Sequence, residues 1–356
     1  MTINIYIVFY YFLIAFFLSA LLTLLVKKIA LKLNIIDLPD AQRKLNYRPI
    51  PLLGGVAIFL AFWLVAGYFL FIHPIYGMEI LSGKMTGVFW ASFVLIVLGA
   101  LDDKKQLSPK LRLLITVVAA LIAIGWGLGL EKITNPLGGI LTLNFWPITV
   151  GSGTFFLLAD ILIFIWLMGM MYTTKILDGL DGLSVGTVFI GAVIIFLLSY
   201  STKYYQPNVA ILSLIFAGSC LGFLLFNFYP AKIFLGEGGS LFIGLMLGVL
   251  AIISGGKVAT ALLVMAIPIL DLARVAYVRI KNKQSVFKGD REHLHFRLLD
   301  LGFSHRRAVL LLYFLAFLFG ITTLFLQSMQ KLYALLVLVI LMAIISHLIG
   351  RKSAVR

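Results

Sequence analysis

Long stretches of apolar residues recur along the whole chain, and they limit the folds open to it more than any other feature. Eleven runs can be recognised, at approximately residues 5–26, 52–72, 87–101, 111–130, 156–176, 183–200, 208–228, 240–255, 258–279, 309–326 and 332–350. A helix needs about 20 apolar residues to cross the hydrocarbon core of a bilayer. Only helices and closed barrels satisfy their backbone polar groups in lipid, and the alternating pattern of barrel strands is missing from the sequence. The runs therefore predict an all-α, polytopic membrane bundle of about 11 transmembrane helices.

The composition excludes the two soluble domains that the length alone would suggest. Hydrophobic residues make up 62% of the 356 residues and charged residues 12%, whereas soluble domains average about 45–50% and about 25%. The single cysteine, Cys220, excludes an intrachain disulfide and a metal–thiolate site. The first run is expected to be a retained span rather than a signal peptide, because its basic residues, Lys27 and Lys28, follow it. No linker or repeat divides the chain, so residues 1–356 are expected to form one integral-membrane domain.

Basic residues gather on one side of this predicted threading. Of the 29 Lys and Arg residues, 24 fall in the loops at 27–51, 102–112, 175–182, 229–239, 274–308 and 351–356, and five fall in the alternate loops. Positively charged loops remain in the cytoplasm, so we expect the N-terminus outside and the C-terminus in the cytoplasm. Most acidic residues lie on the same side, which predicts polar chemistry at the cytoplasmic membrane surface. On the outer side, residues 131–155 predict a short β-hairpin.

Three carboxylates stand where apolar runs end or begin. Asp102 and Asp103 directly follow the third run. Charges at a membrane interface can simply end a helix, but two adjacent aspartates repel one another unless a cation lies between them. Glu237, in the sequence Gly-Glu-Gly-Gly-Ser, opens the eighth run. It is either part of a capped loop or part of a helix N-terminus that binds phosphate.

Two pairs of charged residues have helical spacing. Asp178 and Asp181 belong to the sequence Asp-Gly-Leu-Asp-Gly, and in a helix they would share one face. A capped helix start is the alternative, but two Asp-Gly pairs in succession favour a functional site. Asp271 and Arg274 lie inside the ninth run and are expected to form a structural ion pair.

The longest internal loop is basic and carries histidines. Arg291, His293, His295 and Arg297 follow one another closely, and such side chains can hold a diphosphate. The alternative is a solvated loop that is attracted to anionic lipid headgroups. Zinc is not favoured, because no thiolate or third histidine is near the two histidines.

Together, five carboxylates from three loops face this basic loop on one side of the membrane. Oxygen ligands favour Mg²⁺, with Mn²⁺ as an alternative. A divalent cation beside basic residues indicates a phosphorylated substrate, and a diphosphate fits best. Because the site lies at a membrane surface, one reactant is expected to be soluble and the other a lipid. The residues predict metal-dependent phosphoryl transfer, and no nucleic-acid partner is expected.

These segments resemble, in order and topology, the polyprenyl-phosphate N-acetylhexosamine-1-phosphate transferases. The motifs are Asp102-Asp103, the Asp-Gly repeat from Asp178, the glycine-rich stretch around Glu237, Asp290-Arg-Glu-His-Leu-His, and the segment from Asp37 to Gly55. The resemblance covers about residues 27–310. It implies Mg²⁺-dependent transfer of a sugar 1-phosphate from a UDP-N-acetylhexosamine to polyprenyl (undecaprenyl) phosphate, with release of UMP. It also implies a bacterial inner (plasma) membrane location and the first membrane step of a cell-envelope glycan, such as lipopolysaccharide or teichoic acid.

Details of the motifs refine the resemblance. The His293-Leu-His295 loop resembles the branch that uses UDP-N-acetylglucosamine, not the triple-histidine loop of the muramoyl-pentapeptide transferases. Three positions depart from the family pattern: Lys175 replaces an asparagine, Glu237 replaces an aspartate, and Phe296 stands where a third histidine is frequent. We expect an active enzyme in which Lys175 complements the longer side chain of Glu237.

The resemblance and the chemistry give each residue an expected role. Glu237 is the expected metal ligand, with support from Asp103 or Asp178. Asp102 aligns or deprotonates the lipid phosphate, and Asp181 lies near the uridine or the metal. A phosphate monoester has its second pKa at about 6, so the lipid phosphate is largely dianionic and Asp102 is not needed as a compulsory base. The residues expected to bind the diphosphate, the sugar or the lipid phosphate are His293, His295, Arg291, Arg297, Lys175, Lys44 and Arg48.

Two other functions remain open from the sequence. A transporter or flippase for a phosphorylated lipid would place its ionisable groups near the bilayer midplane and show inverted repeats, and neither is seen here. An inactive relative of the transferases would be consistent with Lys175 at the cation site. The sequence does not decide the identity of the N-acetylhexosamine, the prenyl length, or the oligomeric state, for which a homodimer is one option.

Overall fold

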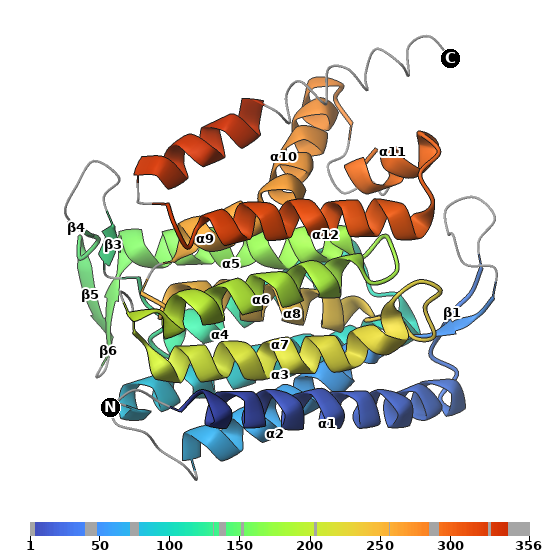
Figure 1. Cartoon of the computed structure of the whole chain (residues 1–356), viewed down its shortest axis with the longest axis horizontal. Coiled ribbons are helices and arrows are strands. Elements are labelled where there is room, and N and C mark those ends of the chain that lie inside the picture. Colours follow the sequence, from blue (N-terminus) through green and yellow to red (C-terminus); the bar gives the residue numbers. More distant parts are fainter. Residues whose placement is uncertain are drawn as a thin grey trace.

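The computed structural model describes residues 4–39, 48–71, 78–130, 132–134, 140–150, 153–202, 205–255, 257–284, 292–326 and 329–340. Helices dominate these residues, and most of them lie side by side along one axis (Figure 1). In chain order the helices are α1 (Ile5–Lys32), α2 (Gly54–Phe71), α3 (Met78–Lys105), α4 (Pro109–Gly125), α5 (Leu157–Leu177), α6 (Leu183–Tyr200), α7 (Pro207–Asn227), α8 (Glu237–Ile253), α9 (Val258–Val264), α10 (Ala266–Lys281), α11 (Leu294–Asp300) and α12 (His305–Thr322). A further helix covers Met329–Ile340.

In the described residues, each apolar run of the sequence is helical over most of its length. Six helices are long and apolar enough to cross a membrane, namely α1, the Gly83–Lys105 part of α3, α5, α6, α7 and α12. The bent pair of α9 and α10 brings this number to seven, and shorter apolar helices cover Gly54–Leu70, Glu237–Ile253 and Met329–Ile340. The described residues therefore confirm a polytopic helical membrane protein.

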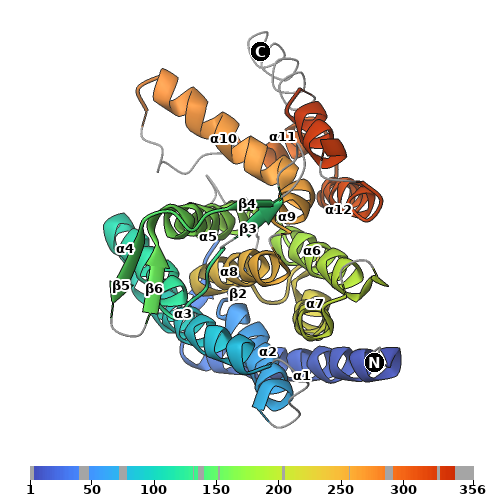
Figure 2. The same cartoon turned by 90° about the vertical axis from the view of Figure 1, so that its left-hand side faces the viewer.

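The ninth apolar run, expected as one span over 258–279, is divided into two helices. The axes of α9 and α10 differ by 76°, and the chain bends at Met265. Pro268 lies in the first turn of α10. It has no N–H to bond the carbonyl of Val264, and its ring crowds that carbonyl, so one continuous helix is disfavoured here. As a result α10 turns away from the other helices (Figure 2).

Short antiparallel strand pairs lie at both ends of the bundle. β3 (Lys132–Thr134) pairs with β4 (Ile140–Thr142), and β5 (Pro147–Val150) pairs with β6 (Gly153–Phe156). The expected hairpin in 131–155 is thus confirmed, and there are two. The sequence did not predict the pairing of β1 (Ile36–Asp37) with β2 (Ile50–Pro51). β1 lies at the end of the bundle opposite to the N-terminus and β3–β6 (Figure 1).

Helix α8 occupies the centre of the bundle, among α2, α3, α5, α6 and α7 (Figure 2). Its residues from Gly238 to Ile252 are buried. Glycine contacts allow this close packing, because small residues let helix backbones approach in a membrane bundle. A Cβ atom on Gly99 of α3 would lie only 2.2 Å from the Cα atom of Gly238, and one on Gly55 of α2 only 2.1 Å from that of Gly239. These contacts bring the charged end of α3 against the start of α8.

Candidate active site

A polar cavity of about 780 Å³ opens at the end of the bundle where α3 and α5 finish and α8 begins. This is the end that also carries β1 (Figure 1). The lining residues that matter for chemistry are Asp37, Asp102, Asp103, Gln106, Arg112, Lys175, Asp178, Asp181, Asn227, Glu237 and Phe296. All five carboxylates that the sequence grouped together therefore face one cavity, although they come from three separate segments of the chain.

Asp103 caps the first turn of α8 from a neighbouring helix. It lies one turn beyond Gly99 on α3, and its Oδ1 atom accepts a hydrogen bond from the backbone N–H of Glu237 at 2.9 Å. The first N–H groups of a helix have no partner within the helix, and negative charge is favoured at that end. Gly236 precedes this turn with a φ of +76°, and a Cβ atom there would lie 2.2 Å from Oδ2 of Asp103. Glycine is therefore required for this contact.

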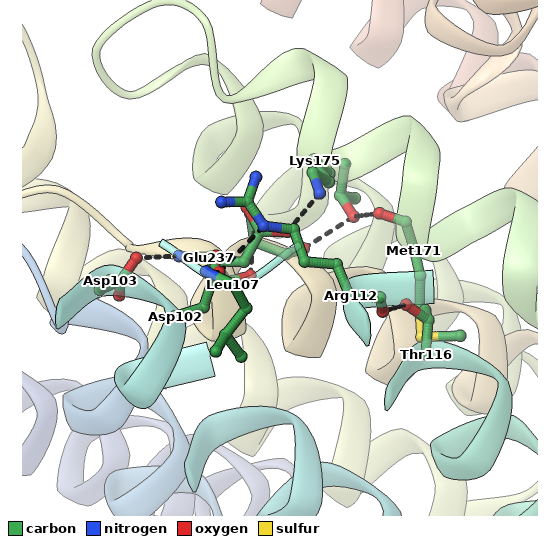
Figure 3. Close-up of polar contacts among 10 residues, drawn as sticks. Asp102, Asp103, Leu107, Arg112, Thr116, Met171, Lys175 and Glu237 are labelled. Atoms are coloured by element: carbon green, nitrogen blue, oxygen red, sulfur yellow. Dashed lines mark hydrogen bonds and ion pairs between the residues drawn. The ribbon is translucent and has the colours of Figure 1, made fainter. Parts of the chain in front are cut away.

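Asp102 is nearly buried, with 4% of its surface exposed. Its Oδ1 atom accepts hydrogen bonds from the backbone N–H of Leu107 at 2.6 Å and from Nε of Arg112 at 2.9 Å (Figure 3). Ser108 caps α4 through its side chain, and Pro109 occupies the first position of that helix. This sharp turn reverses the chain and brings Arg112 back to Asp102. The sequence reasoning missed Arg112, although the Ser-Pro helix start was a signal for its position.

Lys175 and Glu237 form an ion pair inside the cavity (Figure 3). The lysine side chain is 26% exposed and the glutamate side chain 17%. Lys175 comes from the last turn of α5, and Glu237 is the first residue of α8. The two departures from the family pattern at these positions thus contact each other, as expected from the sequence.

Asp178 and Asp181 lie in the turn between α5 and α6, and not on one helical face as their spacing suggested. Gly182, with a φ of +81°, ends this turn and begins α6, a conformation that glycine adopts readily. Oδ2 of Asp181 accepts a hydrogen bond from the backbone N–H of Ala231 at 2.9 Å. Burial raises the pKa of Asp181, and this hydrogen bond opposes the shift. Burial, followed by the nearby Glu237 carboxylate, raises the pKa of Asp178 well above its ordinary value.

The two histidines of the basic loop are buried beside the cavity, and the lining of the cavity includes Phe296 but neither of them. Nδ1 of His293 lies 2.9 Å from Oδ2 of Asp271, which also forms the expected ion pair with Arg274. Nε2 of His295 has no hydrogen-bond partner in the described part of the chain, and a Cβ atom on Gly179 would lie 2.5 Å from it. Burial, and to a smaller extent His293, lower the pKa of His295 to about 3.

The remaining predicted binding residues lie elsewhere or outside the described residues. Lys44 and Arg291 belong to segments that the structure does not describe. Arg48 is exposed, Arg297 is half-buried on α11, and neither belongs to the lining of the cavity. In addition to Arg112, two residues that line the cavity, Gln106 and Asn227, were given no role from the sequence. Neither residue belongs to a charged motif, so the sequence carried little signal for them.

The cavity offers oxygen donors that suit a hard divalent cation. Asp103, Asp178 and Glu237 are the carboxylates that could hold Mg²⁺ there, because Mg²⁺ prefers oxygen ligands. Within the described ranges, however, no three His, Cys, Asp or Glu side chains are already arranged around one metal position. Glu237 is engaged by Lys175, and Asp103 by the start of α8. The donor chemistry therefore fits the ion, while the Lys175 ion pair competes for one of its ligands.

A helical membrane bundle with a carboxylate-lined cavity at one end defines a multi-pass membrane protein whose polar site lies at one end of its helices. The sequence model described as Glycosyl transferase family 4 matches residues 85–255. The chain is 33% identical over 354 residues to the probable undecaprenyl-phosphate N-acetylglucosaminyl 1-phosphate transferase of Bacillus subtilis, covering 95% of this chain and 91% of that protein. The chain belongs to glycosyl transferase family 4, which confirms the resemblance seen in the motifs.

Two further relatives extend this comparison. The decaprenyl-phosphate N-acetylglucosaminephosphotransferase of Mycobacterium leprae is 32% identical over 316 residues, which cover 81% of this chain and 76% of that protein. The undecaprenyl-phosphate alpha-N-acetylglucosaminyl 1-phosphate transferase of Escherichia coli is 26% identical over 307 residues, which cover 83% of this chain and 78% of that protein.

Proposed function

We propose that this protein transfers N-acetylglucosamine 1-phosphate from UDP-N-acetylglucosamine to a polyprenyl phosphate, for which undecaprenyl phosphate is the first candidate, and releases UMP. The observation that carries this proposal is one cavity, at the end of a membrane bundle, in which carboxylates and the cations of Arg112 and Lys175 meet. The names of the Bacillus and Escherichia relatives, both undecaprenyl-phosphate transferases of this sugar phosphate, support the same donor and acceptor.

The reaction exchanges one phosphoanhydride for another. An oxygen of the lipid phosphate attacks the phosphorus that carries the sugar, and the bond from this phosphorus to the oxygen of UMP breaks. UMP leaves with the bonding electron pair. Because one phosphoanhydride is formed as another is broken, the equilibrium lies near unity. Both reactants are anionic. Catalysis therefore depends on holding the two phosphates in line and on neutralising their charge in a site with little water.

Arg112 and Lys175 are suited to hold the donor diphosphate. A guanidinium has five N–H donors, and Arg112 uses Nε for Asp102 while its side chain remains 32% exposed. Its remaining donors can therefore reach phosphate oxygens. Lys175 brings an ammonium group to the same cavity. The carboxylate of Asp102 fixes the direction of the Arg112 side chain, which is a positioning role.

Mg²⁺ is part of the proposal, with Mn²⁺ as a substitute. When bound, the ion supplies positive charge to the diphosphate oxygens and lowers the repulsion between the two substrates. The residues that would hold it are Asp103, Asp178 and Glu237. All three line the cavity and carry carboxylate oxygens, the ligand type that this ion prefers.

We further propose that the chain crosses the bacterial plasma membrane with the cavity at the cytoplasmic face, the N-terminus outside and 11 spans. In the predicted threading, the loops that hold 24 of the 29 basic residues are on the same side as the ends of α3 and α5 and the start of α8, where the cavity opens. Such loops remain in the cytoplasm. A soluble nucleotide sugar then reaches the cavity from the cytoplasm, and the lipid phosphate reaches it from the inner leaflet.

Isotope exchange tests this function directly. Purified protein in detergent is incubated with polyprenyl phosphate, Mg²⁺, UDP-N-acetylglucosamine and labelled UMP, and label in the nucleotide sugar is measured. The transferase produces labelled UDP-N-acetylglucosamine in the presence of the lipid. Neither a lipid-phosphate transporter nor an inactive relative produces it. A parallel series of UDP-sugars identifies the N-acetylhexosamine, and the absence of exchange with every donor overturns the proposal.

A further inference from the structure

The Lys175–Glu237 ion pair places a fixed positive charge inside the carboxylate cluster. Glu237 and Asp103 approach each other at the start of α8, where the Asp103 carboxylate bonds the N–H of Glu237. Asp178 lines the same cavity. Lys175 reaches into this group from α5 and binds Oε1 of Glu237 (Figure 3). An oxygen of one candidate metal ligand, Glu237, is therefore occupied by an ammonium group of the protein itself.

The lysine is held in this place by the packing of its helix. Next to it, Oγ1 of Thr174 donates a hydrogen bond to the carbonyl of Ser240 at 2.8 Å, which ties the end of α5 to the first turn of α8. A Cβ atom on Gly244 would lie 2.2 Å from that Oγ1, so the two helices touch closely at this point. The ammonium also lies 5.6 Å from the centre of the Tyr172 ring, a favourable cation–π position. Lys175 is therefore part of a built site and not a mobile surface side chain.

We propose that Lys175 acts as a built-in cation of the site, and that it lowers the affinity of the ligand-free cavity for divalent metal ions. An ammonium and a divalent ion compete for the same Glu237 oxygen, and they repel each other when both are present. At an effective dielectric constant of about 20, a unit charge within about 5 Å of a divalent ion changes its affinity by more than tenfold. Replacing the lysine by an uncharged residue should therefore strengthen metal binding.

This inference deepens the proposed function, and its biological meaning rests on that function. The ammonium supplies part of the charge compensation that the anionic donor needs, and unlike a metal ion it cannot dissociate. The cavity then receives a nucleotide diphosphate with a permanent cation in place, and the divalent ion enters together with the donor more readily than alone.

Metal binding without nucleotide tests the inference. Purified protein in detergent is titrated with Mn²⁺, and free Mn²⁺ is measured from its electron paramagnetic resonance signal. The variants are Lys175→Asn, Lys175→Met and Lys175→Arg, with Lys232→Asn as a matched control. Lys232 is exposed and lies in the loop that leads to α8, outside the cavity lining. Thermal unfolding of each variant confirms that it is folded.

We expect Lys175→Asn and Lys175→Met to bind Mn²⁺ at least tenfold more tightly than the unchanged protein. Lys175→Arg keeps the charge and should bind like the unchanged protein, as should Lys232→Asn. Equal or weaker binding by both folded, uncharged variants overturns the inference, as does an equal gain in Lys232→Asn. UMP exchange is measured separately. A failure of exchange counts against the transferase function, while the Mn²⁺ titration judges the role of Lys175 by itself.

Discussion

Nδ1 of His293 lies 2.9 Å from Oδ2 of Asp271, a carboxylate on the helix that turns away from the bundle at the 76° bend. The same oxygen accepts the backbone N–H of Leu294 at 3.0 Å, and Oδ1 accepts from Arg274 at 2.9 Å. Because the carboxylate accepts, Nδ1 of His293 carries the hydrogen. Asp271 therefore fixes both the start of α11 and the orientation of the imidazole ring.

Replacing Asp271 by Asn should reduce UMP exchange by about tenfold or more. Hydrogen bonds to charged groups contribute about 1.5–3 kcal/mol each, and about 1.4 kcal/mol corresponds to tenfold. The loss should appear mainly in kcat, because Asp271 acts on the position of α11 and does not line the cavity. Asp300→Asn, at the exposed end of α11, is the control. Full exchange activity in Asp271→Asn would contradict a positioning role.

Asp178→Asn should make the ligand-free protein more stable while it removes transferase activity. Burial and the neighbouring carboxylates raise the pKa of Asp178 well above its ordinary value of 3.8. At a pH between the pKa of Asp178 in the unfolded chain and its raised pKa in the folded protein, the folded protein binds more protons. The free energy of unfolding therefore falls as the pH rises through this interval and stays lower above it. The variant lacks this penalty. Its Tm in detergent should exceed that of the unchanged protein by roughly a few degrees at neutral pH and match it near pH 4. An equal or lower Tm at neutral pH would show that the carboxylate is not destabilising.

His295 should remain neutral throughout the range in which the enzyme works. Burial lowers its pKa to about 3, whereas an unfolded chain titrates near 6.5. The stability linked to His295 is therefore complete above about pH 6.5 and is lost as the pH falls towards 3. In His295→Gln, the Tm should depend less steeply on pH between 4.5 and 6.5. A variant whose Tm varies with pH as steeply as before would show that another group causes the dependence.

The close approach of α3 and α8 can be tested with one methyl group. In Gly238→Ala the new Cβ atom would lie 2.5 Å from the carbonyl oxygen of Leu95, and overpacking of this kind costs about 1–3 kcal/mol or more. Gly169→Ala on α5 is the matched control, because a Cβ atom there meets nothing within 4 Å. Alanine is favoured over glycine in helices by up to about 1 kcal/mol. We expect the Tm to fall in the first variant and to stay equal or rise in the second. The same response in both would argue against the tight contact.

The helices and the grouping of the carboxylates could be predicted because they depend only on the length and the order of the apolar runs. Apolar length determines where a helix is needed, and alternation of sides then places Asp103, Asp178 and Glu237 at one end of the bundle whatever the packing. Contacts that depend on local bends could not be predicted in this way. The break at Met265 is hidden inside a continuous apolar run, in which Pro268 was the only sign of it.

The surroundings of the histidines and of Arg112 show the same limit at the level of side chains. The sequence suggested that His293 binds the diphosphate, and it gave no sign that the bend before α10 brings Asp271 to the imidazole ring. Arg112 counted only as one of many basic residues that set the orientation of the protein. Its contact with Asp102 arises from the reversal of the chain between α3 and α4, which no single motif encodes.

Asp102→Asn separates a positioning role for this residue from a role as base or nucleophile. The asparagine side-chain oxygen can still accept hydrogen bonds from Leu107 N–H and from Nε of Arg112, which Asp102 now accepts at 2.6 and 2.9 Å. The lipid phosphate is largely dianionic at neutral pH, because its second pKa is about 6, so it needs no base to attack. We therefore expect Asp102→Asn to retain measurable exchange, reduced by about tenfold or less, and Asp102→Ala, which loses both hydrogen bonds, to be impaired far more. The measurement is the UMP exchange rate from pH 6 to 9. Exchange abolished in Asp102→Asn at every pH, in a protein that unfolds at the unchanged Tm, would assign the carboxylate a direct chemical step.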